Sequence, residues 1–264
     1  RPPRSTLFPY TTLFRSKYNS ILSTLNWDRM ATPDKYTPEE YHRLYTESYR
    51  LRKEAAERLH ADRMAFIRSH RQSPLALYVA NEMISKSFSV PATDLEEILA
   101  RNCRISDTAR AARFCRQAEQ ACYFCKDIHY PDVPLHTPTF DTTLLSAHIR
   151  PGHVTLIDCW ASWCGPCRAA IPKVKALYDK YGRDRFDVIS ISLDSKKEDW
   201  QKALEEEKMP WPQFIAGNRG YKQLTSRYNI SSIPNLILID GKGQVVCNTF
   251  SPEEIRIELE QILR

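Results

Sequence analysis

Two different hydrophobic patterns divide the chain. Between about residue 37 and residue 124, apolar residues recur mostly at three- and four-residue steps, which places them on one face of an α-helix. Beyond about residue 140, short apolar runs rich in β-branched residues alternate with helical patterns. Such alternation is typical of helices packed over a mixed β-sheet. The sequence therefore predicts an all-α helical region followed by an α/β region.

The helical region has a clear start signal. Thr37 is a candidate N-cap, Pro38 fits the first helical position, and Glu40 completes a capping box. Three further helices are expected to begin near residues 73, 93 and 106. The region has no spacing typical of a catalytic site. We interpret residues 17–130 as a helical module that packs on a partner or forms a homo-oligomer.

The α/β region is expected over residues 141–264. We expect strands at 154–161, 186–193, 213–216, 235–239 and 244–249, and helices at 165–181, 196–207, 219–228 and from 253. The last two strands must be antiparallel, because the short turn Asp240-Gly241-Lys242-Gly243 joins them. Prolines at 131, 134 and 138 disfavour a helix. We interpret residues 131–140 as a proline-rich linker between the two regions.

Composition narrows the function classes. With 264 residues, of which 42% are hydrophobic, the chain is long enough for two modest domains. The net charge of +6 is not gathered into one run, which argues against a nucleic-acid partner. Eight cysteines are few for a disulfide-stapled secreted scaffold and more than packing alone requires. A redox role or residence in the cell envelope fits this content better.

The first 16 residues are treated separately. The stretch TLFPYTTLFRS at residues 6–16 matches, residue for residue, the translation of a common sequencing adapter. We interpret residues 1–16 as an assembly artefact and leave them out of the fold prediction. On this interpretation the natural amino terminus is missing, together with any signal sequence, membrane anchor or preceding domain.

Two cysteines separated by Gly-Pro are the main candidate for chemistry. Cys164, Gly165, Pro166 and Cys167 follow the apolar run of a predicted strand and open a predicted helix. The free N–H groups and the dipole at a helix start favour a thiolate and lower the pKa of its thiol. The pair is therefore predicted to be a redox site. A metal clip would need a second ligand pair at suitable spacing, which is not apparent, so we expect neither a metal nor a cofactor.

Several features occur in a characteristic order. WCGPC ends at Cys167, Asp158 stands six residues before the first cysteine, Pro172 stands five after the second, and Ile233-Pro234 precedes the strand NLILI. A Gly-Lys-Gly turn follows that strand. Together they resemble the thioredoxin superfamily and, more narrowly, its envelope-facing TlpA/ResA-like thiol-disulfide oxidoreductases.

The resemblance implies a thioredoxin-like fold with a mixed central sheet. The helix and strand expected between Leu193 and Arg219 are similar to the insertion that distinguishes this branch. The upstream helices resemble a segment that precedes the thioredoxin domain in proteins of Bacteroidota-type bacteria.

The resemblance also implies roles for the reacting groups. Cys164 would be the exposed thiol that attacks a substrate disulfide, and Cys167 would resolve the mixed disulfide. Asp158 resembles the buried carboxylate that accepts a proton from Cys167, although an exposed strand-end aspartate is the alternative. The Gly-Pro dipeptide favours a reductant over an oxidant.

A substrate-binding surface is implied next to the cysteines. Pro234 resembles the family's cis-proline, which presents the backbone of Ile233 for strand-like pairing with a substrate segment. Trp160 and Trp163 are candidates for an apolar rim, and each could instead be ordinary core. The predicted substrate-binding residues are Trp163, Gly165, Pro166, Ile233 and Pro234.

The sequence is thus that expected of an oxidoreductase that reduces disulfides of periplasmic or cell-envelope proteins and is recharged by a membrane thiol-disulfide electron donor. Ala170 stands where cytochrome c maturation members commonly carry Glu, which disfavours that substrate. One alternative is a thiol peroxidase, disfavoured because Ala161 stands where such enzymes carry Thr or Ser. Another is a non-catalytic partner-binding or holdase protein.

Cys122 and Cys125 form a second C-x-x-C, with Cys115 one heptad earlier on the same helical face. They could form a second redox or metal site, or pack like small apolar side chains. We prefer the packing role, because no strand leads into this motif and neither Gly nor Pro separates the thiols. Cys159 and Cys247 are expected in the cores of strands.

Overall fold

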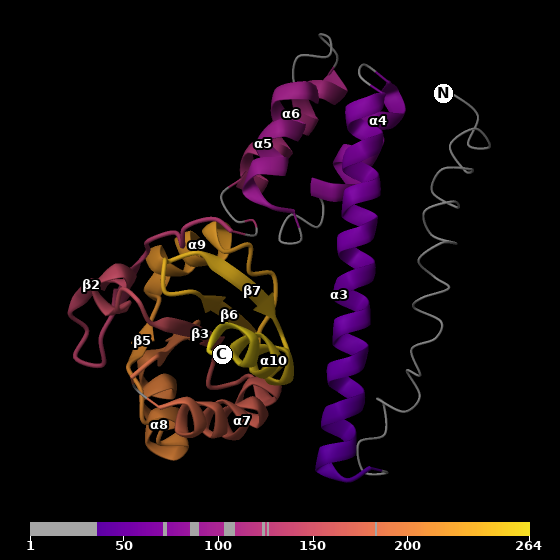
Figure 1. Cartoon of the computed structure of the whole chain (residues 1–264). Coiled ribbons are helices and arrows are strands. Elements are labelled where there is room, and N and C mark those ends of the chain that lie inside the picture. The colour runs from indigo at the N-terminus through magenta and orange to yellow at the C-terminus, as the bar shows by residue number, and fades with distance from the viewer. Residues whose placement is uncertain are drawn as a thin grey trace. The chain divides into compact units, whose positions relative to one another are not determined.

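The structure is a computed structural model that describes residues 36–70, 73–84, 90–102, 109–122, 125, 127–182 and 184–264. The segment 1–16, interpreted from the sequence as an adapter translation, lies outside these residues. The chain divides into two compact units, Arg1–Glu119 and Gln120–Arg264, and each is described by itself (Figure 1).

Most of the described residues of the first unit are helical. Its helices are α3 (Pro38–Ser69), α4 (Pro74–Ile84), α5 (Ala92–Asn102) and most of α6 (Ala109–Cys122), which runs three residues past the division between the units. The predicted capping box is confirmed: Glu40 N–H donates to Thr37 Oγ1 over 3.2 Å, and Thr37 N–H donates to Glu40 Oε2 over 3.0 Å. α3 and α5 are joined by hydrogen bonds from Arg68 to Glu97 and between His60 and Asp94.

The second unit contains a mixed sheet of seven strands in the order β2-β1-β5-β4-β3-β6-β7. The five predicted strands are confirmed as β3 (Val154–Trp160), β4 (Phe186–Ser192), β5 (Gln213–Ile215), β6 (Asn235–Ile239) and β7 (Val245–Thr249). β3 lies at the centre, parallel to β4 and antiparallel to β6. All seven of its residues are buried, because neighbouring strands and helices cover both of its faces.

Two further strands differ from the sequence prediction. β1 (Pro134–His136) lies inside the stretch predicted as a linker, and it pairs antiparallel with β2 (Thr142–Leu144) and with β5. Pro134 is the first residue of β1, a position where the missing N–H is tolerated. Three-residue strands are too short to show a period of two in the sequence. A short 3₁₀ helix, η3 (Leu145–His148), follows β2.

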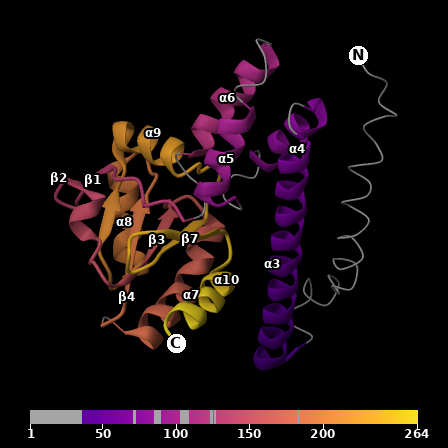
Figure 2. The ribbon, with the colours of Figure 1, turned by 45° about the horizontal axis from the view of Figure 1, so that its top comes forward.

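Four helices flank the sheet: α7 (Gly165–Tyr181), α8 (Lys197–Glu207), α9 (Gly217–Arg227) and α10 (Pro252–Ile262). α9 lies on the opposite side of the sheet from α7 in both views (Figures 1 and 2). On the α7 side, Leu156 and Leu236 of the sheet pack with Val174 of α7 and Leu259 of α10. The predicted insertion is present as α8 and β5.

The turn between β6 and β7 explains their pairing. Asp240 Oδ1 accepts hydrogen bonds from the amides of Lys242 and Gln244 over 2.9 and 2.8 Å. Gly243 has a φ of +82°, a conformation that glycine adopts without a steric penalty. The predicted antiparallel pairing of these strands is confirmed.

Candidate active site

The sheet register brings together residues that are far apart in the sequence. Cys159, near the end of β3, pairs with Asn235 at the start of β6. The loop that follows β3 and the residues that precede β6 therefore lie at the same edge of the sheet. This arrangement brings the WCGPC segment and Ile233-Pro234 to one place, as the resemblance implied.

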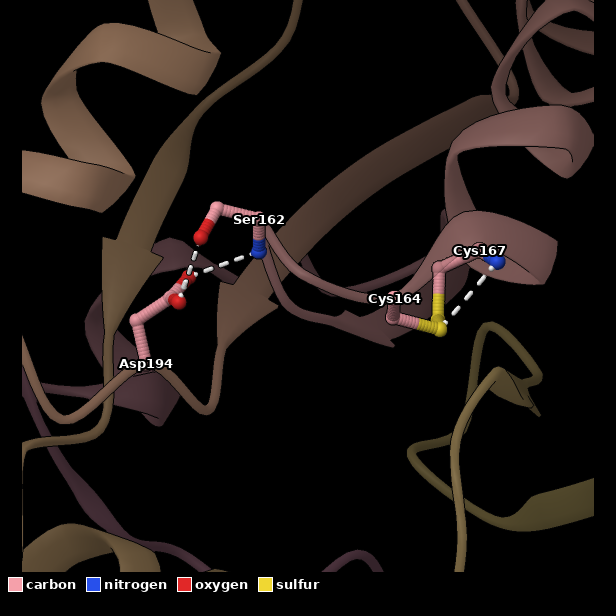
Figure 3. Close-up of a disulfide and its surroundings, with 4 residues drawn as sticks. All are labelled: Ser162, Cys164, Cys167 and Asp194. Atoms are coloured by element: carbon pink, nitrogen blue, oxygen red, sulfur yellow. Dashed lines mark hydrogen bonds between the residues drawn. A yellow bond between two sulfur atoms is a disulfide. The ribbon is translucent and has the colours of Figure 1, made fainter.

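The two cysteines of WCGPC form a disulfide at the start of α7. Their Cα atoms are 5.3 Å apart, and Cys164 is the N-cap residue of the 17-residue helix. The N–H of Cys167 donates to Cys164 Sγ over 3.2 Å (Figure 3). A sulfur at this position faces the positive end of the helix dipole, so a thiolate released there on reduction is stabilised.

Cys164 differs from the prediction in its exposure. It was expected to be exposed, yet in this disulfide form only 5% of Cys164 and 2% of Cys167 are accessible. The reason is local packing: both cysteines belong to a cluster with Trp160, Trp200 and neighbouring apolar residues. Position at the helix end distinguishes the two sulfurs more than exposure does.

Asp194 holds the loop in front of the disulfide, and the sequence analysis did not identify it. Its buried carboxylate accepts hydrogen bonds from the Ser162 amide (2.9 Å) and hydroxyl (2.7 Å), as Figure 3 shows. The Ser192 hydroxyl donates to the same carboxylate over 2.7 Å. The Ser192 bond holds the Asp194 carboxylate, and the two bonds from Ser162 fix the residue that precedes Trp163. The sequence feature that could have indicated Asp194 is the Ser-x-Asp formed with Ser192 at the end of a predicted strand.

Asp158 is buried on the side of β3 that faces α7. It lies in register between Ser190 of β4 and Leu236 of β6. Burial raises the pKa of its carboxyl group to about 6, and a hydrogen bond from the Ser190 hydroxyl partly opposes that rise. The buried placement implied by the resemblance is observed, rather than the exposed alternative. A carboxyl group with this pKa exchanges protons near neutral pH.

The two tryptophans that were candidates for an apolar rim differ in burial. Trp160 is fully buried and is a core residue, whereas Trp163 is 70% exposed beside the disulfide. Gly165 and Pro166 are exposed, and Ile233 and Pro234 are half-buried. The Ile233-Pro234 peptide bond is cis. The residues predicted to bind substrate therefore all reach the surface at this edge of the sheet.

An ion pair ties the inserted helix to the helix of the active site. Arg168, which directly follows Cys167, donates to Glu207 over 2.6 Å and to Glu206 over 2.8 Å. Lys175 Nζ also donates to the carbonyl oxygen of Glu207. These contacts hold the end of α8 against α7. The sequence analysis predicted the inserted helix but not these contacts.

The other cysteines that the structure describes are either buried thiols or disulfide-bonded. Cys125, Cys159 and Cys247 are buried thiols, whereas Cys115 is disulfide-bonded, so the packing role predicted for Cys115 is wrong. Burial strongly raises the pKa of the Cys159 thiol, with a smaller contribution from Asp158, so it stays protonated. Within the residues that the structure describes, no group of three His, Cys, Asp or Glu side chains could hold a metal ion.

The sheet order and the disulfide at the start of α7 define a redox domain of the thioredoxin-like class. Residues 152–245 match the family model described as Thioredoxin-like. The chain therefore carries a thioredoxin-like domain in its carboxy-terminal half.

Several known proteins are similar to this part of the chain. The thiol-disulfide oxidoreductase ResA of Geobacillus kaustophilus is 26% identical over 47% of this chain and 75% of its own length. The sporulation thiol-disulfide oxidoreductase A of Bacillus subtilis is 25% identical over 38% of this chain and 61% of its own. A solved thioredoxin domain from Bacteroides vulgatus is 24% identical over 52% of this chain and 97% of that one, with a TM-score of 0.47.

None of the helices in the described part of the chain is both long and apolar enough to cross a membrane.

Proposed function

We propose that this protein is a thiol-disulfide oxidoreductase that reduces disulfides of proteins in the cell envelope through Cys164 and Cys167. The observation that carries the proposal is the Cys164–Cys167 disulfide at the amino-terminal end of α7, where the helix stabilises a thiolate. The names of the curated relatives support the same reaction.

The reaction proceeds in two exchanges. In the reduced protein, the Cys164 thiolate attacks one sulfur of a substrate disulfide, the substrate S–S bond breaks, and the other substrate sulfur leaves as a thiolate. Cys167 then gives its proton to the Asp158 carboxylate and attacks Cys164 Sγ. The second substrate sulfur leaves, and both substrate thiolates take up protons. The substrate gains two electrons, and the protein ends with the Cys164–Cys167 disulfide.

Trp163, Ile233 and Pro234 are proposed to receive the substrate. Trp163 offers an exposed aromatic surface beside the disulfide, and the half-buried Ile233 lies where its backbone can pair with an extended segment. The substrates are therefore proteins with a disulfide in an accessible, extended stretch of chain.

Return to the dithiol requires an electron donor. We infer that this donor is a membrane thiol-disulfide protein on the periplasmic side. The relatives named for thiol-disulfide exchange include the interchange protein HelX of Rhodobacter capsulatus, 24% identical over 46% of this chain.

A mixed-disulfide trap tests the proposal. In Cys167→Ser, Cys164 still attacks but nothing resolves the adduct, so a covalent complex with a reduction-sensitive bond accumulates on incubation with a disulfide-containing protein. Non-reducing electrophoresis and mass spectrometry of the complex identify the bond to Cys164. Cys164→Ser and the double variant are the matched controls and should form no adduct. An adduct of equal yield in Cys164→Ser would contradict the proposal.

A further inference from the structure

Three side chains, those of Ser190, Trp211 and Met209, meet beside the predicted proton acceptor Asp158. The Ser190 hydroxyl on β4 donates to Asp158 Oδ2 over 2.8 Å, and the indole N–H of Trp211 donates to Ser190 Oγ over 2.8 Å. Met209 Sδ lies 3.9 Å from the same Ser190 oxygen. Asp158, Ser190 and Trp211 are buried, so water does not compete for these groups.

The Ser190 hydroxyl has one proton to donate and two lone pairs to accept with. Trp211 always occupies one lone pair, because an indole N–H is a donor only. When Asp158 is ionised, the hydroxyl proton points to its carboxylate. When Asp158 is protonated, its own O–H donates to the second Ser190 lone pair, and the Ser190 proton turns to Met209 Sδ.

We propose that Ser190, held by Trp211, is a positioning residue that keeps Asp158 hydrogen-bonded both with and without its proton. The inference rests on the proposed function, in which Asp158 takes the proton of Cys167. A buried acceptor that is satisfied in both states changes protonation without moving its neighbours. The hydroxyl rotates, while the backbone pairing of Asp158 and Ser190 stays in place.

The groups that face Asp158 leave Ser190 as its hydrogen-bond donor. Across β6 the register partner is Leu236, which is apolar. Cys164 and Cys167, at the start of α7, are bonded to each other and do not titrate in the oxidised form. Cys159, the next residue on β3, keeps its proton because burial raises the pKa of its thiol. Burial and the Ser190 hydrogen bond therefore set the pKa of Asp158 in opposite directions.

The test is a carboxyl titration of the full chain in its oxidised form. The Asp158 carboxyl signal is followed against pH by infrared or carbon NMR spectroscopy and assigned by its absence in Asp158→Asn. In Ser190→Ala, burial is no longer opposed, so the titration midpoint should rise by about one pH unit, a tenfold weaker acid. Trp211→Phe keeps an aromatic side chain but removes the indole N–H, and should shift the midpoint less in the same direction.

Ser192→Ala is the matched control, because this hydroxyl lies two residues further along β4 and donates to Asp194. It should leave the Asp158 midpoint unchanged. An unchanged midpoint in Ser190→Ala would overturn the proposal. If Ser190→Ala does not fold, an unchanged midpoint in Trp211→Phe does so instead.

The titration needs neither a substrate nor turnover, so its outcome is independent of whether the chain reduces disulfides. In an active chain, the pH profile of the step that resolves the mixed disulfide gives a second readout. Its rise with pH follows the ionisation of Asp158 and should move upward in Ser190→Ala by the same amount as the midpoint. If the wild type has no reductase activity but Ser190→Ala still shifts the Asp158 midpoint, the proposed function is contradicted and the positioning role of Ser190 still holds.

Discussion

Asp158 is an acidic side chain inside the sheet, where burial disfavours its ionised form. Its folded pKa of about 6 is above the value of about 3.9 for an unfolded aspartate. The stabilisation from the protonated form is therefore complete below about pH 4 and is lost as the pH rises through about 6. Two pH units correspond to about 3 kcal/mol of unfolding free energy. The proposed proton acceptor thus lowers the stability of the protein at neutral pH.

Replacing this carboxylate by a neutral isostere should stabilise the protein above its pKa. We expect oxidised Asp158→Asn to be about 2 kcal/mol more stable than the wild type at pH 8 and no more stable at pH 4. Urea unfolding at the two pH values measures the difference. Asp194→Asn is the control, because that carboxylate is buried with three hydrogen-bond donors and its loss should destabilise. Equal stabilities of Asp158→Asn and the wild type at pH 8 would show that burial of the ionised Asp158 carboxylate does not destabilise the protein.

At the scale of elements, the loop between β3 and α7 is fixed from both ends. Its far end is the disulfide at the start of α7, and its near end is Ser162, bound by Asp194 from the segment after β4. The exposed Trp163 lies between them. An orientation of Trp163 that suits a substrate therefore depends on a carboxylate outside the WCGPC motif.

Removing the Asp194 carboxylate should loosen this loop. Asp194→Ala leaves the Ser162 amide, the Ser162 hydroxyl and the Ser192 hydroxyl without their acceptor, at a cost of about 2–4 kcal/mol in unfolding free energy. Ser162→Ala loses one of these bonds and should cost about 1 kcal/mol. Chemical denaturation of the two variants measures both values. A cost for Asp194→Ala no larger than that for Ser162→Ala would show that the carboxylate does not hold the loop.

The long elements and the short strand β5 could be predicted from the sequence, whereas the short strands β1 and β2 could not. β3 and α7 have strong periodic patterns, and the start of α3 has a complete capping box at Thr37. β1 and β2 have three residues each, and their pairing with the rest of the sheet depends on contacts distant in the sequence.

The candidate site likewise contains residues that could be predicted from the sequence and residues that could not. The WCGPC motif and Asp158 could be found by spacing, because both are tied to one strand and the helix after it. Ser190, Asp194 and Trp211 were missed, because a single serine, aspartate or tryptophan has no pattern. Their importance comes from strand register and burial, which appear only when β4 lies beside β3.

At the scale of the molecule, the described chemistry lies in one of the two units. The disulfide, Asp158, Asp194 and the cis-proline all belong to the unit Gln120–Arg264, and the family match falls within it. The helices of the first unit are proposed, as from the sequence, to pack on a partner or on a second copy. The proposed reaction uses residues of the second unit.

Catalysed reduction of insulin disulfides tests the central claim most directly. The full chain, recycled by dithiothreitol, should precipitate the insulin B chain several-fold faster than dithiothreitol alone. Cys164→Ser should reduce the rate to that of dithiothreitol alone, because the attacking thiol at the amino-terminal end of α7 is removed. Turnover retained in Cys164→Ser, or a wild-type rate equal to that of dithiothreitol, would contradict the account.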